Sequence, residues 1–168
     1  MEKQITSPVT DLLNSQGVAF DWVEIPLSED KKPIRSLEAL LTGKGLDPKS
    51  VVRSVLFRGG SEKFYLLAVA GGGRADWGIL RKHLGERKLR MAEYDEVAEV
   101  TGYVVGAVPP IALPDDVLVL VDNSVNDFET VIIGSGVLGY ALALKGSELM
   151  KIFARAEPRA ELGGFVKE

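Results

Sequence analysis

Two apolar, β-prone runs at residues 51–57 and 64–70 constrain the fold of this chain more than any other feature. The segment between them, residues 58–63, is polar and carries two glycines. Short apolar runs on either side of such a segment are typical of a hairpin of two buried strands. We therefore expect this hairpin to form the centre of a sheet.

The rest of the chain switches between helical and strand patterns at irregular intervals. These gaps are too uneven for a doubly wound sheet, so the expected class is mixed α/β, with a curved, barrel-like mixed sheet flanked by helices. Ser147 is expected to cap the last helix. The predicted helices cover residues 8–16, 37–42, 76–84, 93–100 and 146–152, and the further strands cover 19–25, 88–91, 117–121, 130–133 and 138–144.

Length and composition indicate one globular domain. A chain of 168 residues with 46% apolar and 26% charged residues has an ordinary composition and a length that suits one core. We place the domain at residues 1–153. Residues 154–168, which include Pro158 and two adjacent glycines, are expected to form a partly ordered tail.

Residue types that are rare or absent exclude several kinds of chemistry. The chain has no cysteine and a single histidine, His83, which excludes disulfides, thiolate nucleophiles and zinc sites built from cysteine or several histidines. No metal site is expected. No apolar run is long enough to cross a bilayer, and the first residues lack the pattern of a secretory signal, so we expect a cytoplasmic protein that does not contact membranes.

Charge and glycine patterns limit the nucleic-acid and nucleotide hypotheses. The net charge is −4, so any contact with phosphate must be local. The densest basic stretch, residues 81–90, is either a solvated helix end or a nucleic-acid contact. The triple glycine at 71–73 lacks the Lys-Ser/Thr of a phosphate-binding loop and the spacing of a dinucleotide site, so it predicts turns and no nucleotide cofactor.

The stretch from Thr101 to Pro110 is the most unusual local sequence. Gly102 and Gly106, followed by Pro109 and Pro110, cannot continue a helix or a central strand, because proline fixes φ and lacks an N–H donor. Taken alone, the stretch predicts either a plain structural turn or a rigid loop that offers its backbone to a ligand.

Several segments occur together in the order and spacing of one family. They are residues 51–57, 66–74, 91–93 with 96–97, 101–110 and 119–122. The chain resembles the YbaK-like aminoacyl-tRNA deacylases, which are relatives of the editing insertion of bacterial prolyl-tRNA synthetase. The resemblance runs from about Ser7 to Ile152. Its most specific element is Gly106-Ala-Val-Pro-Pro110, which matches the family's motif of glycine, three residues and proline.

The resemblance implies an enzyme that hydrolyses the ester of a mischarged tRNA bearing a small amino acid. It implies that the 106–110 loop contacts the terminal adenosine and its amino acid, and that the tRNA ribose hydroxyl assists water. The implied partners are the aminoacylated 3′ end of tRNA and an aminoacyl-tRNA synthetase. The implied catalytic positions are Arg53, Gly106 and Pro110, and those for substrate are Ser54, Gly102, Tyr103, Ala107, Val108, Pro109, Asp122, Gly134, Ser135 and Gly136. The local density of positive charge, and not the resemblance, makes Arg81, Lys82, Arg87 and Lys88 the candidate tRNA contacts.

Two places depart from the family pattern, and the first is at Arg53. Arg53-Ser54-Val55 stands where the family carries a lysine that opens Lys-Thr-Leu and helps to hold the tRNA terminus. Arginine keeps the charge and can bind phosphate with two hydrogen bonds, but it is longer and planar. A non-catalytic module that binds tRNA ends or aminoacyl-nucleotide-like ligands, and a hydrolase of small esters or amides, therefore remain as alternatives.

Three further positions have both a structural and a functional interpretation. Residues 134–136 are the second departure from the family pattern, and they form either a tight turn between strands or a wall facing the amino acid, where the Ser135 hydroxyl is available. Relatives can carry a polar residue where this chain has Ala141. Asp122 at a strand end either caps a turn or orients water. A Ser-His-Asp triad has His83 as its single candidate base and no supporting motif.

Overall fold

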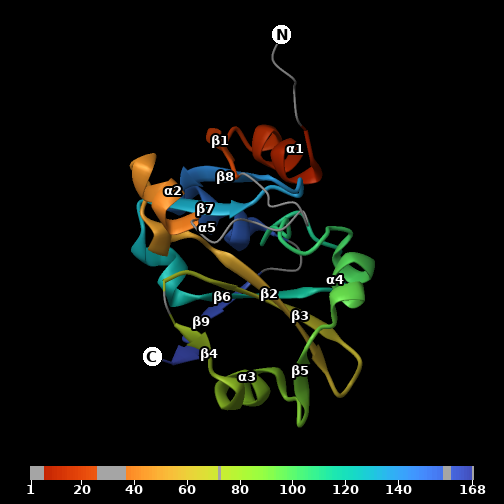
Figure 1. Cartoon of the computed structure of the whole chain (residues 1–168). Helices are drawn as coiled ribbons and strands as arrows, with labels where there is room; N and C mark the ends of the chain where they lie inside the picture. The colour runs from red at the N-terminus through yellow and green to blue at the C-terminus, as the bar shows by residue number, and fades with distance from the viewer. Residues whose placement is uncertain (1–5, 26–36, 72, 157–159, 168) are drawn as a thin grey trace.

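The computed structural model describes residues 6–25, 37–71, 73–156 and 160–167 (Figure 1). Its centre is the predicted hairpin. Strands β2 (Arg53–Gly59) and β3 (Phe64–Val69) pair antiparallel from Arg53 opposite Val69 to Arg58 opposite Phe64. The side chains of Leu66 and Leu67 in β3 are fully buried, as expected for a strand that packs on both faces.

The hairpin belongs to a five-stranded mixed sheet in the order β5-β2-β3-β6-β9. β5 (Leu89–Met91) lies antiparallel to β2, while β6 (Leu118–Asp122) and β9 (Glu161–Gly163) continue the sheet in parallel. A two-stranded ribbon joins β4 (Arg74–Ala75) to β10 (Val166–Lys167).

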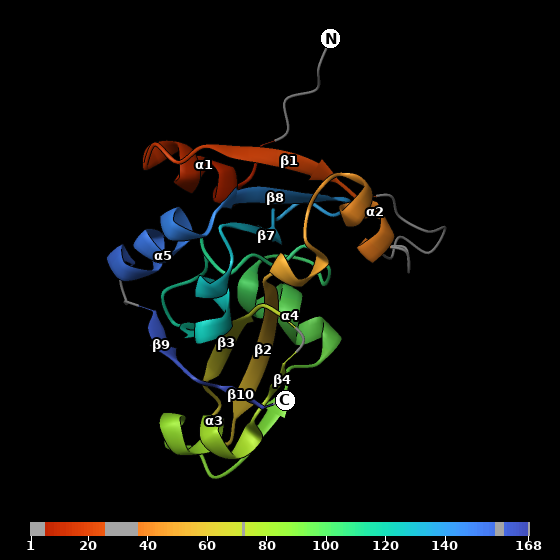
Figure 2. The ribbon, with the colours of Figure 1, turned by 90° about the vertical axis from the view of Figure 1, so that its left-hand side faces the viewer.

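A second, antiparallel sheet has the order β1-β8-β7 and lies above the first in Figures 1 and 2. Its strands are β1 (Phe20–Glu24), β8 (Tyr140–Lys145) and β7 (Thr130–Gly134). The two sheets meet where Val51, just before β2, bridges to Ile132 of β7, and the Val52 amide donates to the Ile132 carbonyl at 2.7 Å. The start of β2 is therefore held against β7.

Helices cover both sheets. They are α1 (Pro8–Ser15), α2 (Leu37–Gly43), α3 (Trp77–Leu84), α4 (Tyr94–Thr101) and α5 (Gly146–Arg155), with short 3-10 turns at Pro48–Ser50 and Asn123–Asp127. Neighbouring side chains of β2 point to opposite faces. Phe57 accordingly packs with Leu80 of α3, while Leu56 packs with Val97 of α4.

The structure confirms the mixed α/β class, with one qualification. The described strands form a five-stranded sheet, a three-stranded sheet and a two-stranded ribbon, and they are not closed as a barrel. The prediction that Ser147 caps the last helix is wrong, because α5 begins at Gly146 and its N-cap is Lys145.

The segment that we set apart as a tail contributes β9 and β10 to the sheets, and it buries Ala160 and Phe165. Residues 157–159, which include Pro158, and residue 168 lie outside the described residues. Within the described residues, no helix has the length and apolar character required to cross a membrane.

Candidate active site

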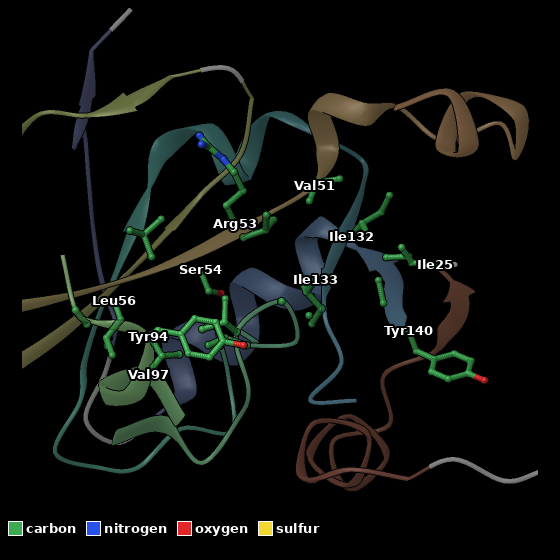
Figure 3. Close-up of a pocket in the computed structure, with 18 of the residues that line it drawn as sticks. Ile25, Val51, Arg53, Ser54, Leu56, Tyr94, Val97, Ile132, Ile133 and Tyr140 are labelled. Atoms are coloured by element: carbon green, nitrogen blue, oxygen red, sulfur yellow. The ribbon is translucent and has the colours of Figure 1, made fainter. Parts of the chain in front are cut away.

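A cavity of about 500 Å³ opens between the first half of β2, helix α4, strand β7 and the 101–110 loop (Figure 3). This volume lies within the range of small-molecule sites. Most of the surrounding side chains are aliphatic, and the polar groups lie on Arg53, Ser54, Tyr94 and Tyr140. The site is thus an apolar pocket with a few polar groups, which suits a ligand that has both kinds of surface.

The 101–110 loop begins at the end of α4. Gly102 takes the left-handed conformation that ends the helix, with φ of 82°. The buried Tyr103 then fastens the loop to the protein, because its hydroxyl donates to the Ala112 carbonyl at 2.7 Å. Gly106 has φ of 96°, which a residue with a side chain adopts only with strain. The Tyr103 hydrogen bond and the glycine at 106 thus fix the path of the loop in this structure.

The loop divides into two parts with different surroundings. Gly106 and Val108 line the cavity, whereas Ala107, Pro109 and Pro110 are buried. Pro110 lines a separate apolar hollow beside α5. Of the three positions that the resemblance marked as catalytic, Arg53 and Gly106 are therefore on the cavity wall, and Pro110 supports the loop from behind.

The second predicted stretch, residues 134–136, packs directly against this loop. A Cβ atom on Gly134 would lie 2.3 Å from the Val108 carbonyl oxygen, and the Gly136 amide donates to the Ala107 carbonyl at 2.9 Å. Ser135 is fully buried, and its hydroxyl donates to the Tyr140 carbonyl at 2.7 Å. Gly134 thus lines the cavity, while Ser135 closes the turn between β7 and β8.

Arg53 lies at the cavity edge, and its side chain leaves in another direction. Its Nη2 donates to the Gly73 carbonyl at 2.7 Å, and Figure 3 shows the guanidinium turned away from Ser54 and Tyr94. Alternation along β2 accounts for this, since neighbouring residues face opposite sides of the strand. A guanidinium has more donors than this one bond uses. Arg53 can therefore bind phosphate at the rim without leaving Gly73.

Asp122 is buried outside the cavity lining. Its carboxylate accepts the Ser124 amide at 3.0 Å and the Phe165 amide at 2.8 Å. It thus caps the 3-10 turn after β6 and ties the C-terminal segment to it. Of its two interpretations, this geometry favours the turn cap.

The four basic residues Arg81, Lys82, Arg87 and Lys88 are exposed on α3 and the turn after it. The Lys88 carbonyl accepts the Gly60 amide at 2.9 Å, which places this group beside the far end of β2 from Arg53. A seven-residue strand is about 20 Å long. These side chains can therefore reach only a ligand that extends well beyond the cavity.

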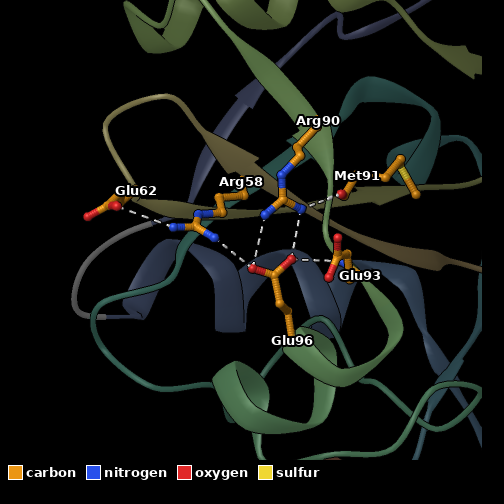
Figure 4. A network of polar contacts seen from close by, with 6 residues as sticks. All are labelled: Arg58, Glu62, Arg90, Met91, Glu93 and Glu96. Atoms are coloured by element: carbon orange, nitrogen blue, oxygen red, sulfur yellow. Dashed lines mark hydrogen bonds and ion pairs between the residues drawn. The ribbon is translucent and has the colours of Figure 1, made fainter.

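An ion-pair network fixes α4 against the hairpin (Figure 4). The Glu96 carboxylate accepts from Arg90 at 2.7 Å and from Arg58 at 3.0 Å, and it also accepts the Glu93 amide at 2.8 Å. The Glu93 and Glu96 pair forms a capping box at the start of α4. The hydrogen bonds from Arg90 and the Glu93 amide lower the pKa of Glu96 from 4.5 to about 2.

This shift predicts acid sensitivity. Because the folded-state pKa is depressed, Glu96 stabilises the fold fully above its unfolded pKa of about 4.5, and this contribution is lost as the pH falls towards 2. We expect the urea midpoint of the wild type to fall more steeply over that interval than that of Glu96→Gln. Parallel pH curves for the two proteins would contradict this role.

Sequence reasoning did not single out Tyr94, Val97, Ile132 or Ile133, all of which line the cavity. Val97 and the two isoleucines carry no local signal, because apolar residues on helices and strands are ordinarily core. Tyr94, in contrast, does carry a local signal. A large aromatic residue directly after the N-cap of an otherwise polar helix start has no local structural reason.

Comparison with known proteins identifies the family of this chain. Residues 31–152 match the model of the aminoacyl-tRNA editing domain. The chain belongs to this family. This confirms the resemblance to the YbaK-like proteins, whose segments include the cavity-lining parts of β2, α4 and the 101–110 loop.

Relatives of this editing domain include whole synthetases and smaller proteins. Proline–tRNA ligase of Kosmotoga olearia is 27% identical over 122 residues, which cover 73% of this chain and 20% of the ligase. YwhH of Bacillus subtilis, an uncharacterized protein, is 33% identical over 105 residues, which cover 62% of this chain and 66% of YwhH. The chain thus spans about a fifth of the ligase that it matches.

Solved structures share the fold of this editing domain. The hypothetical protein APE2540 superposes with a TM-score of 0.78 at 22% identity, over 96% of this chain and 100% of the other. A candidate trans-editing enzyme for prolyl tRNA synthetase gives a TM-score of 0.75 at 23% identity, over 96% of each chain.

Proposed function

We propose that this editing domain is an aminoacyl-tRNA deacylase that acts in trans and hydrolyses the ester of a mischarged tRNA bearing a small amino acid. The observation that carries the proposal is the contact between Gly134 and the backbone of Ala107 and Val108, which sets Gly134 beside Gly106 and Val108 in one wall of the apolar cavity. At its two glycines, this wall can approach an ester closely without a side chain in between.

The chemistry needs little from side chains. An aminoacyl ester is already activated, and the neighbouring ribose hydroxyl can assist attack by water. The protein must hold the ester and water in a reactive geometry and offer donors to the oxyanion as it develops. The backbone amides of Gly106 and Val108, which line the cavity, suit this task, whereas the Ala107 amide already donates to the Val104 carbonyl at 3.1 Å. Because the cavity must also take the terminal ribose, the room left for the amino acid favours a small one.

The tRNA would contact the protein at two places. Arg53 at the rim would bind a phosphate near the 3′ end, and the basic group on and after α3 would bind the backbone about 20 Å away. A prolyl-tRNA synthetase is the partner that the relatives suggest. The cytosol, where charged tRNA is used, is the expected location.

The bond from Arg53 to Gly73 favours one alternative, a module that binds tRNA ends without hydrolysis. If turnover needs a cation inside the cavity, a guanidinium that is turned away cannot supply it. The two functions differ in what restores activity. Binding without turnover, converted to turnover by Arg53→Lys, would identify the non-catalytic module.

The direct test is deacylation of a panel of mischarged tRNAs by the purified protein. We expect at least one tRNA with a small amino acid to lose it well above the rate in buffer, and Arg53→Ala to slow this by roughly tenfold, as for loss of one charged phosphate contact. Binding of uncharged tRNA should weaken with salt, with a slope that is about one unit shallower for Arg53→Ala.

Lys44→Ala is a matched control for this test, because Lys44 is an exposed cation that follows α2 outside the cavity lining. Hydrolysis of free amino-acid esters without any requirement for tRNA would instead indicate a small-molecule hydrolase. The enzyme proposal would be overturned if no tRNA in the panel lost its amino acid faster than in buffer. In that case Arg53→Ala and a bulky residue at Gly106 would also leave the rate unchanged.

A further inference from the structure

An exposed apolar rim surrounds the mouth of the cavity. Tyr94 is 70% exposed, Met91 is 51% exposed and Val105 is 40% exposed, and all three line the cavity. Exposed apolar side chains are common singly, but three around one opening indicate a binding surface. The aromatic ring of Tyr94 is the largest and most exposed group among them.

The backbone that carries Tyr94 is firmly held. Tyr94 is the first residue of α4, between the two partners of the capping box. The Glu96 ion pairs join this helix start to β2 and β5, and the Ala92 amide donates to the Leu56 carbonyl at 2.9 Å. Ordering the ring on a ligand therefore costs little backbone entropy, and the ring can serve as a fixed platform.

A second observation at the same end of the cavity also points to a ligand. The Ser54 hydroxyl oxygen is buried, and among the described residues it has no hydrogen-bond partner. In Figure 3, Ser54 lies between Arg53 and Tyr94 on one side of the cavity. Buried polar groups are almost always paired, so an orphan beside an open pocket indicates where a polar group of the ligand lies.

We propose that the base of the 3′-terminal nucleotide of tRNA stacks on the ring of Tyr94, with its ribose over Ser54. The proposal rests on the deacylase function above and names how the same site holds its substrate. Aromatic stacking is the usual way in which proteins hold single-stranded nucleotides, and it tolerates any base. The stacked base would place the ester beyond Ser54, towards the wall formed by Gly106 and Gly134.

The test compares two RNA minihelices that differ at one position. One ends in the natural 3′ single strand, and the other has an abasic residue as its last nucleotide. We expect the wild type to bind the intact RNA roughly tenfold more tightly, as is typical for one stacked base. Tyr94→Phe should keep this preference, while Tyr94→Ala and Tyr94→Leu should lose it.

The leucine variant separates stacking from simple apolar contact. Equal preference in Tyr94→Leu and Tyr94→Phe, or full preference in Tyr94→Ala, would overturn the proposal, as would a wild type that binds both RNAs alike. Because Tyr94 is largely exposed, these variants should melt like the wild type. Ser54→Ala provides a second arm, since it should weaken binding of both RNAs without lowering the melting temperature.

The outcome is distinct from that of the deacylation panel. If the wild type deacylates mischarged tRNA and Tyr94→Ala equals it in both RNA binding and deacylation, only the stacking proposal is overturned. A wild type that deacylates no tRNA overturns the proposed function.

Discussion

Substituting alanine for Gly134 is expected to reduce deacylation at least tenfold and to lower the free energy of unfolding by about 1–3 kcal/mol. The new Cβ would lie 2.3 Å from the carbonyl oxygen of Val108 and 3.0 Å from that of Ala107. Both neighbours are main-chain atoms, so the clash cannot be relieved by turning a side chain. Either β7 or the loop must move, and the cavity wall moves with it.

Gly43→Ala is the matched control for this variant. Gly43 ends α2, and a Cβ there meets no atom within 4 Å. The free energy of unfolding should therefore stay the same or rise slightly, since alanine restricts the unfolded chain more than glycine does. Urea unfolding and the deacylation rate of both variants give the comparison. A Gly134→Ala protein that equals the wild type in both measurements would show that the loop does not depend on this contact.

Asp122→Ala is expected to destabilise the protein by about 2–4 kcal/mol, because two amide donors lose a charged acceptor. One of them, the Phe165 amide, is buried away from bulk solvent, since Asp122 and Phe165 are each 2% exposed. Hydrogen exchange of the Phe165 amide should accelerate along with the loss of stability. Asp122→Asn retains one acceptor oxygen and should lose less.

The same pair of variants distinguishes the two roles considered for Asp122. If the carboxylate oriented water in catalysis, Asp122→Asn would stop deacylation while the fold stayed stable. We expect instead that activity follows stability in both variants. An Asp122→Ala protein with wild-type stability would contradict the structural role.

The elements that were predicted well are those whose signals are local. The hairpin of β2 and β3 follows from two apolar runs and the turn between them, and α3 runs from its Asp76 cap to Gly85, whose φ of 68° ends the helix. These features depend on residues within one turn or one strand length. Errors arose where a local signal had a competitor, as at Ser147, which lies inside α5 because the helix begins one residue earlier.

By itself, the sequence determined the mixed α/β class, the family, and the position of a glycine and proline loop, since these depend on local periodicity and on motifs whose order is read along the chain. The tertiary structure alone decided which atoms meet. Gly134 touches Val108, Asp122 binds the Phe165 amide 43 residues away, and Arg53 turns to Gly73 while Ser54 faces the cavity. Such contacts depend on which distant strands become neighbours and on how two sheets pack, and no local pattern encodes either.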